Sequence, residues 1–139
     1  MADLDPLRRF PTLVTDRLIL RDTTMMDAAQ VSKILSDPCV SEYYGVDHVT
    51  DLERSREIIS LRQERFQRGE AIRWAIALAE NNLYLGSVEI RNKPGDPGCA
   101  ELGYELSPEF WGQGFMNEAL REAIEDVKLI QKAKLFFHN

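Results

Sequence analysis

The chain has 139 residues, of which 44% are hydrophobic and 29% are charged, and its formal net charge is −6. This length predicts one domain with a real hydrophobic core. The acidic balance argues against a nucleic-acid-binding protein, which usually carries a basic face, and suits a site that receives a cationic amine. No apolar run reaches the length of a membrane span, and the amino terminus lacks the apolar region of a signal peptide. We therefore expect no membrane partner and a cytoplasmic location.

The first half of the chain begins with a strand and a short helix. Apolar and polar residues alternate over Arg17–Asp22, which predicts a strand. Asp27 is placed to cap a helix over Ala28–Leu35, whose apolar residues fall at helical spacing. Asp37-Pro38 then stops this helix.

A second, longer helix is predicted from a capping box formed by Thr50 and Glu53. It continues to about Arg68, where Gly69 ends it. Arginines and glutamates alternate along it, a pattern typical of a solvated face with i,i+4 ion pairs. A nucleic-acid-binding stripe is the alternative, and the interspersed acidic residues weigh against it.

Three strands in series are predicted next. The segments Ile72–Ala79, Leu83–Asn92 and Ala100–Leu106 each contain alternating or continuous apolar residues and are joined by short connections. Such a series forms an antiparallel meander. Gly86, inside the second of these strands, is a candidate for a β-bulge.

A glycine-bearing turn and a helix follow the third of these strands. Ser107-Pro108 ends the strand, and the turn contains Gly112 and Gly114. The helix after the turn has one apolar stripe, formed by Met116, Ala119, Leu120, Ala123, Ile124 and Val127. Backbone N–H groups at the start of a helix attract phosphate oxygens, so the turn is a candidate anion site. A tight turn without a ligand remains the alternative, and the spacing matches neither a Walker A loop nor a dinucleotide fingerprint.

The segment ELGYELSPEFWGQGFMNEAL resembles the acetyl-CoA-binding segment of the GNAT N-acetyltransferase superfamily. The usual motif is Arg/Gln-x-x-Gly-x-Gly/Ala, and this chain has Trp111 and Met116 at its first and last positions. Both departures are familiar in the ribosomal-protein N-terminal acetyltransferase (RimJ/RimL-like) branch, whose opening strand is similar to Thr15–Arg21. The resemblance extends over Phe10–Asp126.

The resemblance implies a fold and a set of binding residues. The fold is of the α/β (α+β) class, with a mixed, mostly antiparallel central sheet flanked by helices. The acyl donor is acetyl-CoA and the acceptor is a primary amine, either a protein N-terminus or a small molecule, which attacks directly in a ternary complex. The residues implied to bind acetyl-CoA are Glu105, Leu106, Ser107, Gly112, Gln113, Gly114, Phe115 and Met116.

The acceptor pocket and the general base are less closely defined. By resemblance, Tyr43, Tyr44 and His48 are candidates for lining the acceptor pocket; the alternative is that the tyrosines pack over the core and the histidine is solvated. Glu89, Glu101 and Glu105 are candidate bases. We choose Glu101, because the branch commonly has an acidic residue just before Gly-Tyr, although a surface glutamate is the simpler interpretation.

Two cysteines and the carboxyl terminus complete the predictions. Cys39 and Cys99 match no metal-ligand spacing, so we expect reduced thiols and no metal site, with a disulfide as the alternative. A parallel strand is predicted over Ala133–Phe137. The family has a further helix and strand beyond this point, so the domain is expected to be cut short, either naturally or because the sequence is incomplete. An inactive CoA-binding or protein-interaction domain, or a domain completed by a second copy in a homodimer, is therefore the alternative to an active enzyme.

Overall fold

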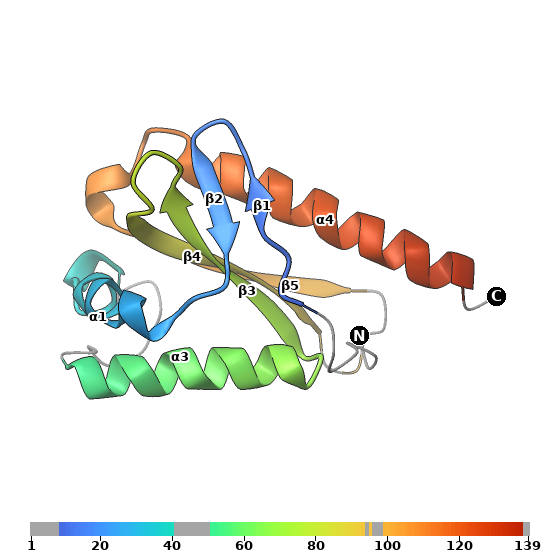
Figure 1. The fold of residues 1–139 in the computed structure, drawn as a ribbon, viewed down its shortest axis with the longest axis horizontal. Coiled ribbons are helices and arrows are strands. Elements are labelled where there is room, and N and C mark those ends of the chain that lie inside the picture. The colour runs from blue at the N-terminus through green and yellow to red at the C-terminus, as the bar shows by residue number, and fades with distance from the viewer. Residues whose placement is uncertain (1–8, 41–50, 94, 96–98, 138–139) are drawn as a thin grey trace.

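The computed structural model describes residues 9–40, 51–93, 95 and 99–137, and these residues form a five-stranded sheet with helices on both sides (Figure 1). The strands lie in chain order, and each neighbouring pair is antiparallel. They are β1 (Leu13–Val14), β2 (Leu18–Arg21), β3 (Ala71–Leu78), β4 (Tyr84–Asn92) and β5 (Ala100–Leu106). The helical elements are η1 (Met25–Asp27), α1 (Ala28–Leu35), α3 (Leu52–Gln67), η2 (Pro108–Phe110) and α4 (Phe115–Phe137). Of these described helices, none combines the length and apolar character that crossing a bilayer requires.

Four of the five predicted strands are confirmed. β5 has the predicted bounds, while β2, β3 and β4 differ from theirs by one residue at one or both ends. The bulge expected at Gly86 is also present, because the pairing with β3 shifts register after the Ile76–Gly86 pair. Strand β1 was not predicted, because its two residues are too few to show an alternation.

Two predicted helix caps are wrong in detail. Asp27 does not cap α1 with its side chain; instead its carboxylate accepts the Thr24 N–H at 2.9 Å and pairs with Arg21. Helix α3 begins after Asp51, whose side chain accepts the Arg54 N–H at 2.7 Å. The other predicted cap, Thr50, lies outside the described residues. Asp is as good an N-cap residue as Thr, so the two adjacent candidates could not be ranked from the sequence.

The strand predicted over Ala133–Phe137 is wrong, because α4 continues to Phe137. The sequence from Lys128 to Lys134 consists of Lys, Leu, Ile, Gln and Ala and contains no glycine or proline that would end the helix. The described sheet is therefore antiparallel throughout, without the parallel strand that the sequence suggested.

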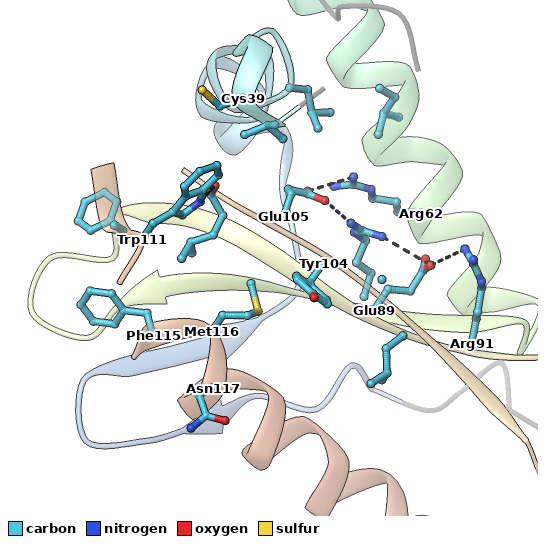
Figure 2. Close-up of a pocket in the computed structure, with 18 of the residues that line it drawn as sticks. Cys39, Arg62, Glu89, Arg91, Tyr104, Glu105, Trp111, Phe115, Met116 and Asn117 are labelled. Carbon is cyan, nitrogen blue, oxygen red and sulfur yellow. Dashed lines mark hydrogen bonds and ion pairs between the residues drawn. The ribbon is translucent and has the colours of Figure 1, made fainter. Parts of the chain in front are cut away.

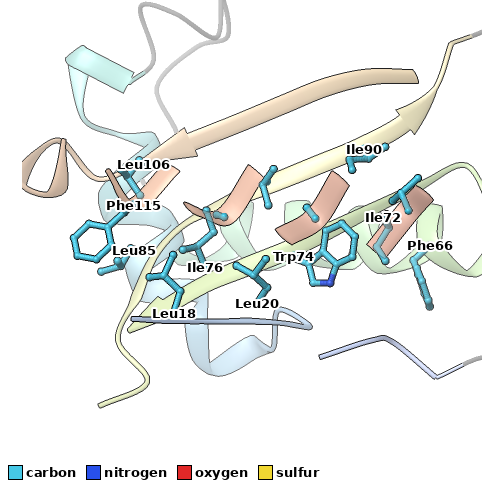
Figure 3. Packing of buried hydrophobic residues seen from close by; sticks show 14 residues of the cluster. Leu18, Leu20, Phe66, Ile72, Trp74, Ile76, Leu85, Ile90, Leu106 and Phe115 are labelled. Atoms are coloured by element: carbon cyan, nitrogen blue, oxygen red, sulfur yellow. The ribbon is translucent and has the colours of Figure 1, made fainter. Parts of the chain in front are cut away.

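Each face of the sheet carries its own apolar cluster. On one face, α4 packs through Phe115, Ala119, Ala123 and Val127 against apolar residues of β2–β5, around the fully buried Trp74 (Figure 3). On the opposite face, α1 and Ile59 of α3 pack against Ala75 and Tyr84. The strands alternate between these two sets, which is why Trp74 and Ala75 belong to different clusters.

Candidate functional site

The turn between β5 and α4 has the backbone conformation that its glycines allow. Gly112 has φ +74° and Gly114 has φ +82°, and α4 begins at the next residue, Phe115. These positive φ values favour glycine, since other L-residues are strained there. The indole of Trp111 donates to the Leu106 carbonyl oxygen at 2.8 Å and so ties the turn back to β5. The turn therefore presents the first N–H groups of a long helix, a site suited to an anion.

A second contact ties this turn to the other end of the chain. Arg17 donates from Nε to Glu118 Oε1 at 2.8 Å and from Nη1 to the Gln113 carbonyl oxygen at 3.0 Å. Its guanidinium also lies over the Phe115 ring, 4.1 Å from the centroid. Thr15 Oγ1 donates to the other oxygen of Glu118 at 2.5 Å. Burial disfavours the ionised form of Glu118, but the hydrogen bonds from Thr15 and Arg17 outweigh it, so the pKa of Glu118 is lowered.

The turn opens into a cavity of about 1230 Å³. Figure 2 shows its two parts: Trp111, Phe115, Met116 and Asn117 lie at the α4 end, and charged side chains lie towards α3. The strand between them, β5, contributes Leu102, Gly103, Tyr104, Glu105 and Leu106 to the lining. This volume is somewhat above the roughly 300–1,000 Å³ that is typical of small-molecule binding sites.

Two buried glutamates form the charged part of the cavity. Glu105 accepts hydrogen bonds from Arg62, Arg73 and the Ser87 hydroxyl. Glu89 is paired with Arg65 at 3.3 Å, with Arg91 at 3.2 Å and with Arg73 at 3.5 Å. Charges this deeply buried need such partners, because an isolated carboxylate in a protein interior is very costly. We refer to Arg62, Arg65, Arg73 and Arg91 together with Glu89 and Glu105 as the arginine–glutamate cluster.

The charge run of α3 is only partly the solvated face that the sequence predicted. Arg54 pairs with Glu57, and Arg68 with Glu64, at exposed positions, as expected. Arg62 instead turns toward the sheet, where its side chain is 10% exposed, and Arg65 reaches Glu89. The prediction fails for these two because the partners that attract them lie on β4 and β5, far away in sequence.

The burial of the side chains of β5 does not follow the alternation of apolar and polar residues in its sequence. Leu106 is buried in the core, but Leu102 and Tyr104 are 47% and 54% exposed. Glu105, on the opposite face, is buried. The reason is that the described part of α4 covers only the carboxyl-terminal end of β5, whereas Arg62 and Arg73 neutralise Glu105.

Most of the residues predicted to bind the acyl donor lie around the cavity. Glu105, Leu106, Gly112, Gly114, Phe115 and Met116 line it. Ser107 and Gln113 are not among the lining residues: the Ser107 N–H donates to the Leu85 carbonyl oxygen at 2.8 Å, and the Gln113 carbonyl faces Arg17. Six of the eight predicted residues therefore line one cavity.

The remaining predicted site residues are placed differently. Glu101 does not line the cavity; its side chain is 37% exposed and accepts from Arg91 Nε at 2.9 Å. Tyr43, Tyr44 and His48 lie outside the described residues. Cys39 and Cys99 are free and exposed, and Cys39 is at the cavity.

Arg17 and Arg73 were not predicted to be parts of the site. Arg73 stands between Ile72 and Trp74 in the middle of an apolar strand, which is a usable signal, since a charged residue there requires a buried partner. Arg17 gave no comparable signal, because its partners are about a hundred positions away in the chain.

Comparisons with known proteins agree on the fold and the family. Residues 17–137 match the family described as acetyltransferase (GNAT) domain. The chain is 32% identical over 115 residues to the uncharacterized N-acetyltransferase YoaA of Bacillus subtilis, covering 83% of this chain and 65% of that protein. The chain thus spans about 65% of the length of this relative.

Solved structures share the fold at lower identity. The RimL ribosomal L7/L12 alpha-N-protein acetyltransferase superimposes with a TM-score of 0.70 at 20% identity, over 89% of this chain and 68% of that one. The microcin C7 self-immunity acetyltransferase MccE, in complex with acetyl-CoA and AMP, gives a TM-score of 0.67 at 17% identity, over 81% of this chain and 63% of that one.

Proposed function

The chain belongs to the acetyltransferase (GNAT) domain family, and we propose that it transfers an acetyl group from acetyl-CoA to a primary amine. The acceptor is a protein N-terminal amine or a small-molecule amine, as in the RimJ/RimL-like branch that the sequence resembles. The observation that carries the proposal is the turn with positive φ at Gly112 and Gly114, which starts α4 at the edge of a large cavity. This geometry suits the pyrophosphate of acetyl-CoA.

We place the two ends of the acyl donor on different elements. The backbone N–H groups from Gln113 to Met116 hold the pyrophosphate, where the positive end of the α4 dipole adds attraction. Backbone groups around Glu105–Ser107 pair with the amides of the pantetheine arm, which lies beside β5. A strand N–H polarises the thioester oxygen and stabilises the charge that develops on it.

The chemical step is a direct attack in a ternary complex. The amine nitrogen, once the ammonium has lost a proton, attacks the thioester carbonyl carbon and the C–N bond forms. The C–S bond breaks, and the second proton of the nitrogen passes to the leaving sulfur, so that CoA is released as the thiol. In Glu89 and Glu105, both carboxylate oxygens already accept from arginines or serine. Glu101 has one oxygen bonded to Arg91, and its other oxygen accepts nothing from the described residues. We therefore keep Glu101 as the base, acting through a water molecule.

The proposal is tested first by titrating acetyl-CoA into the protein in a calorimeter and then by measuring the free thiol that an amine releases. Saturable one-site binding and amine-dependent thiol release are expected. Binding without release, across a panel of N-terminal peptides, polyamines and aminoglycosides, would favour the alternative of a CoA-binding domain that does not transfer acetyl. No binding to a folded sample would overturn the assignment of the turn.

A further inference from the structure

The cavity is positively charged, in contrast to the acidic chain as a whole. Among the described residues, five arginines line it, against two glutamates, Glu89 and Glu105. Two of the arginines also bind glutamates outside the lining, since Arg54 pairs with Glu57 and Arg91 with Glu101. Even without these two, Arg62, Arg65 and Arg73 outnumber the two lining carboxylates. The net charge of −6 therefore gave the wrong expectation for this surface.

Arg62 has a hydrogen-bonding capacity that the cluster does not use. Its Nη2 donates to Glu105 Oε1 at 3.2 Å, whereas its Nη1 is buried and has no hydrogen-bond partner among the described residues. A buried guanidinium nitrogen without a partner is unfavourable, so a ligand that accepts from it would gain affinity. Arg62 also borders a smaller cavity of about 200 Å³, so its side chain lines both cavities.

The positive part of the cavity is separate from the turn. The arginines come from α3, β3 and β4, and the turn comes from the β5–α4 connection (Figure 2). If the turn holds the pyrophosphate of acetyl-CoA, the arginine–glutamate cluster remains available to the second substrate. Arginine is suited to this because its planar guanidinium binds carboxylate and phosphate oxygens in pairs.

We propose that the acceptor is an amine that also carries a carboxylate or phosphate group, and that Arg62 and Arg65 bind this anionic group. This inference rests on the proposed acetyl transfer and specifies its acceptor. The anion contacts the arginines, and the amine extends from it towards β5. Two kinds of acceptor have this chemistry. One is a protein N-terminus followed by acidic residues, and the other is a small amine that carries an anionic group.

The test compares matched acceptors on the CoA-saturated protein. The peptide arm uses the amino-terminal sequences Ser-Glu-Asp, Ser-Gln-Asn and Ser-Lys-Arg on a common neutral tail. The small-molecule arm compares β-alanine with its amide, and phosphoethanolamine with ethanolamine. Dissociation constants are measured by calorimetry, and kcat/KM by thiol release with acetyl-CoA. We expect the anionic member of at least one arm to bind about tenfold more tightly than its neutral counterpart, and the arm that shows this identifies the source.

Arginine variants assign the effect to the cluster. Arg65→Gln is suited to this, because the side chain of Arg65 is 42% exposed. In this variant Glu89 still forms its ion pairs with Arg73 and Arg91. Arg62→Met removes the unpartnered nitrogen. Both should reduce the preference for the anionic acceptor several-fold and leave the acetyl-CoA dissociation constant unchanged. Arg68→Gln, at the C-cap of the same helix but outside the cavity lining, is the matched control and should keep the full preference.

The outcomes separate this inference from the proposed function. Acetyl transfer without a charge preference, or no measurable binding of any anionic probe, overturns the inference and leaves the enzyme assignment to stand. A preference that survives both arginine variants also overturns it, as does a loss of acetyl-CoA affinity with an unchanged preference. An anion preference in binding without acetyl transfer to any acceptor supports the anion site and refutes the proposed function. If Arg62→Met does not fold, Arg65→Gln still decides.

Discussion

Arg17 and Glu118 are 101 positions apart in sequence, yet the guanidinium Nε of Arg17 lies 2.8 Å from Glu118 Oε1. The Arg17 backbone N–H donates to the other oxygen of the same carboxylate at 3.1 Å. One glutamate in the first turn of α4 therefore holds the start of β2, and the same arginine holds the Gln113 carbonyl. The conformation of the glycine turn thus depends on the amino-terminal strand as well as on its glycines.

Glu118→Gln should lower the free energy of unfolding at pH 7 by about 1.5 kcal/mol, because hydrogen bonds to a charged group are lost or weakened. In the folded state the pKa of Glu118 lies below its ordinary value of 4.5. The contribution of its charge is therefore fully present above pH 4.5 and is lost as the pH falls through the lowered pKa. Urea denaturation of both proteins at pH 7 and below pH 4.5 should show the difference in stability shrinking with acidification.

The control for Glu118 is Glu125→Gln on the same helix, whose carboxylate is exposed and has one long contact of 3.9 Å, to Lys128. This variant should match the parent at both pH values, since exposed pairs contribute little. A stability difference for Glu118→Gln that stays constant or grows at acid pH would contradict the role given to its charge.

Gly114 offers a test of the turn itself. Gly114→Ala should cost about 1–2 kcal/mol of stability, because a residue with a Cβ is strained at φ +82°. The space itself is open, since the nearest neighbour of that Cβ, Arg17 Nη2, is 3.5 Å away. Gly114→Glu adds a carboxylate at the proposed pyrophosphate site and should abolish acetyl-CoA binding in calorimetry while the protein remains folded. Comparing the two variants separates strain from charge, and equal affinities would refute the phosphate assignment.

The buried Glu105 should contribute strongly to stability. Glu105→Gln removes the charge that compensates Arg62 and Arg73 and should reduce the free energy of unfolding by about 3 kcal/mol, a fall of roughly 10 °C in Tm. Thermal denaturation measures this. Glu57→Gln breaks an exposed pair with Arg54 and should change stability by less than about 0.5 kcal/mol. Similar effects of the two variants would show that the cluster is solvated.

The sequence predicted the sheet well because its signals are local. Alternation marks β2, β3 and β5, and the pair Gly112 and Gly114 correctly indicated a turn before a helix. The apolar stripe of α4 also packs as expected, with Ala119 and Ala123 buried. These features depend on residues within a few positions of one another.

The charged part of the site could not be predicted for the opposite reason. Arg62 and Glu105 are 43 positions apart, and Arg73 and Glu105 are 32 apart. Read along the helix, Arg62 looks like any other member of an exposed charge run, and its burial depends on which face α3 turns to the sheet. The strand predicted at the carboxyl terminus failed because AKLFF is compatible with either structure and only its context decides.

Glu101→Gln tests the proposed base. Because a positioned base contributes about 10²–10⁴-fold, kcat should fall by a factor in that range. Stability should change by less than about 1 kcal/mol, since the residue forms one partly exposed pair, with Arg91. Steady-state kinetics with the parent and with Glu125→Gln provide the comparison. An unchanged kcat would show that the proton leaves by another route.

Gly86 tests how closely β4 and β5 must approach at the cavity. A Cβ built on Gly86 lies 2.2 Å from the Glu105 carbonyl oxygen and 2.8 Å from the Leu106 Cα, both backbone atoms that cannot rotate away. Gly86→Ala should therefore push the strands apart beside the cavity lining and cost about 1–3 kcal/mol, the usual range for overpacking. If the pantetheine arm lies beside this part of β5, the affinity for acetyl-CoA should fall as well.

Gly103 provides the matched control on the adjacent strand. A Cβ there would meet only side-chain atoms at ordinary distance, the nearest being Glu89 Oε2 at 3.6 Å. Gly103→Ala should therefore leave stability within about 0.5 kcal/mol of the parent, because alanine suits an extended strand at least as well as glycine. Urea denaturation and acetyl-CoA titration of both variants decide the matter. A Gly86→Ala protein as stable as Gly103→Ala would mean that β5 can move away at little cost, and the β4–β5 spacing would then be adjustable rather than fixed by the glycine.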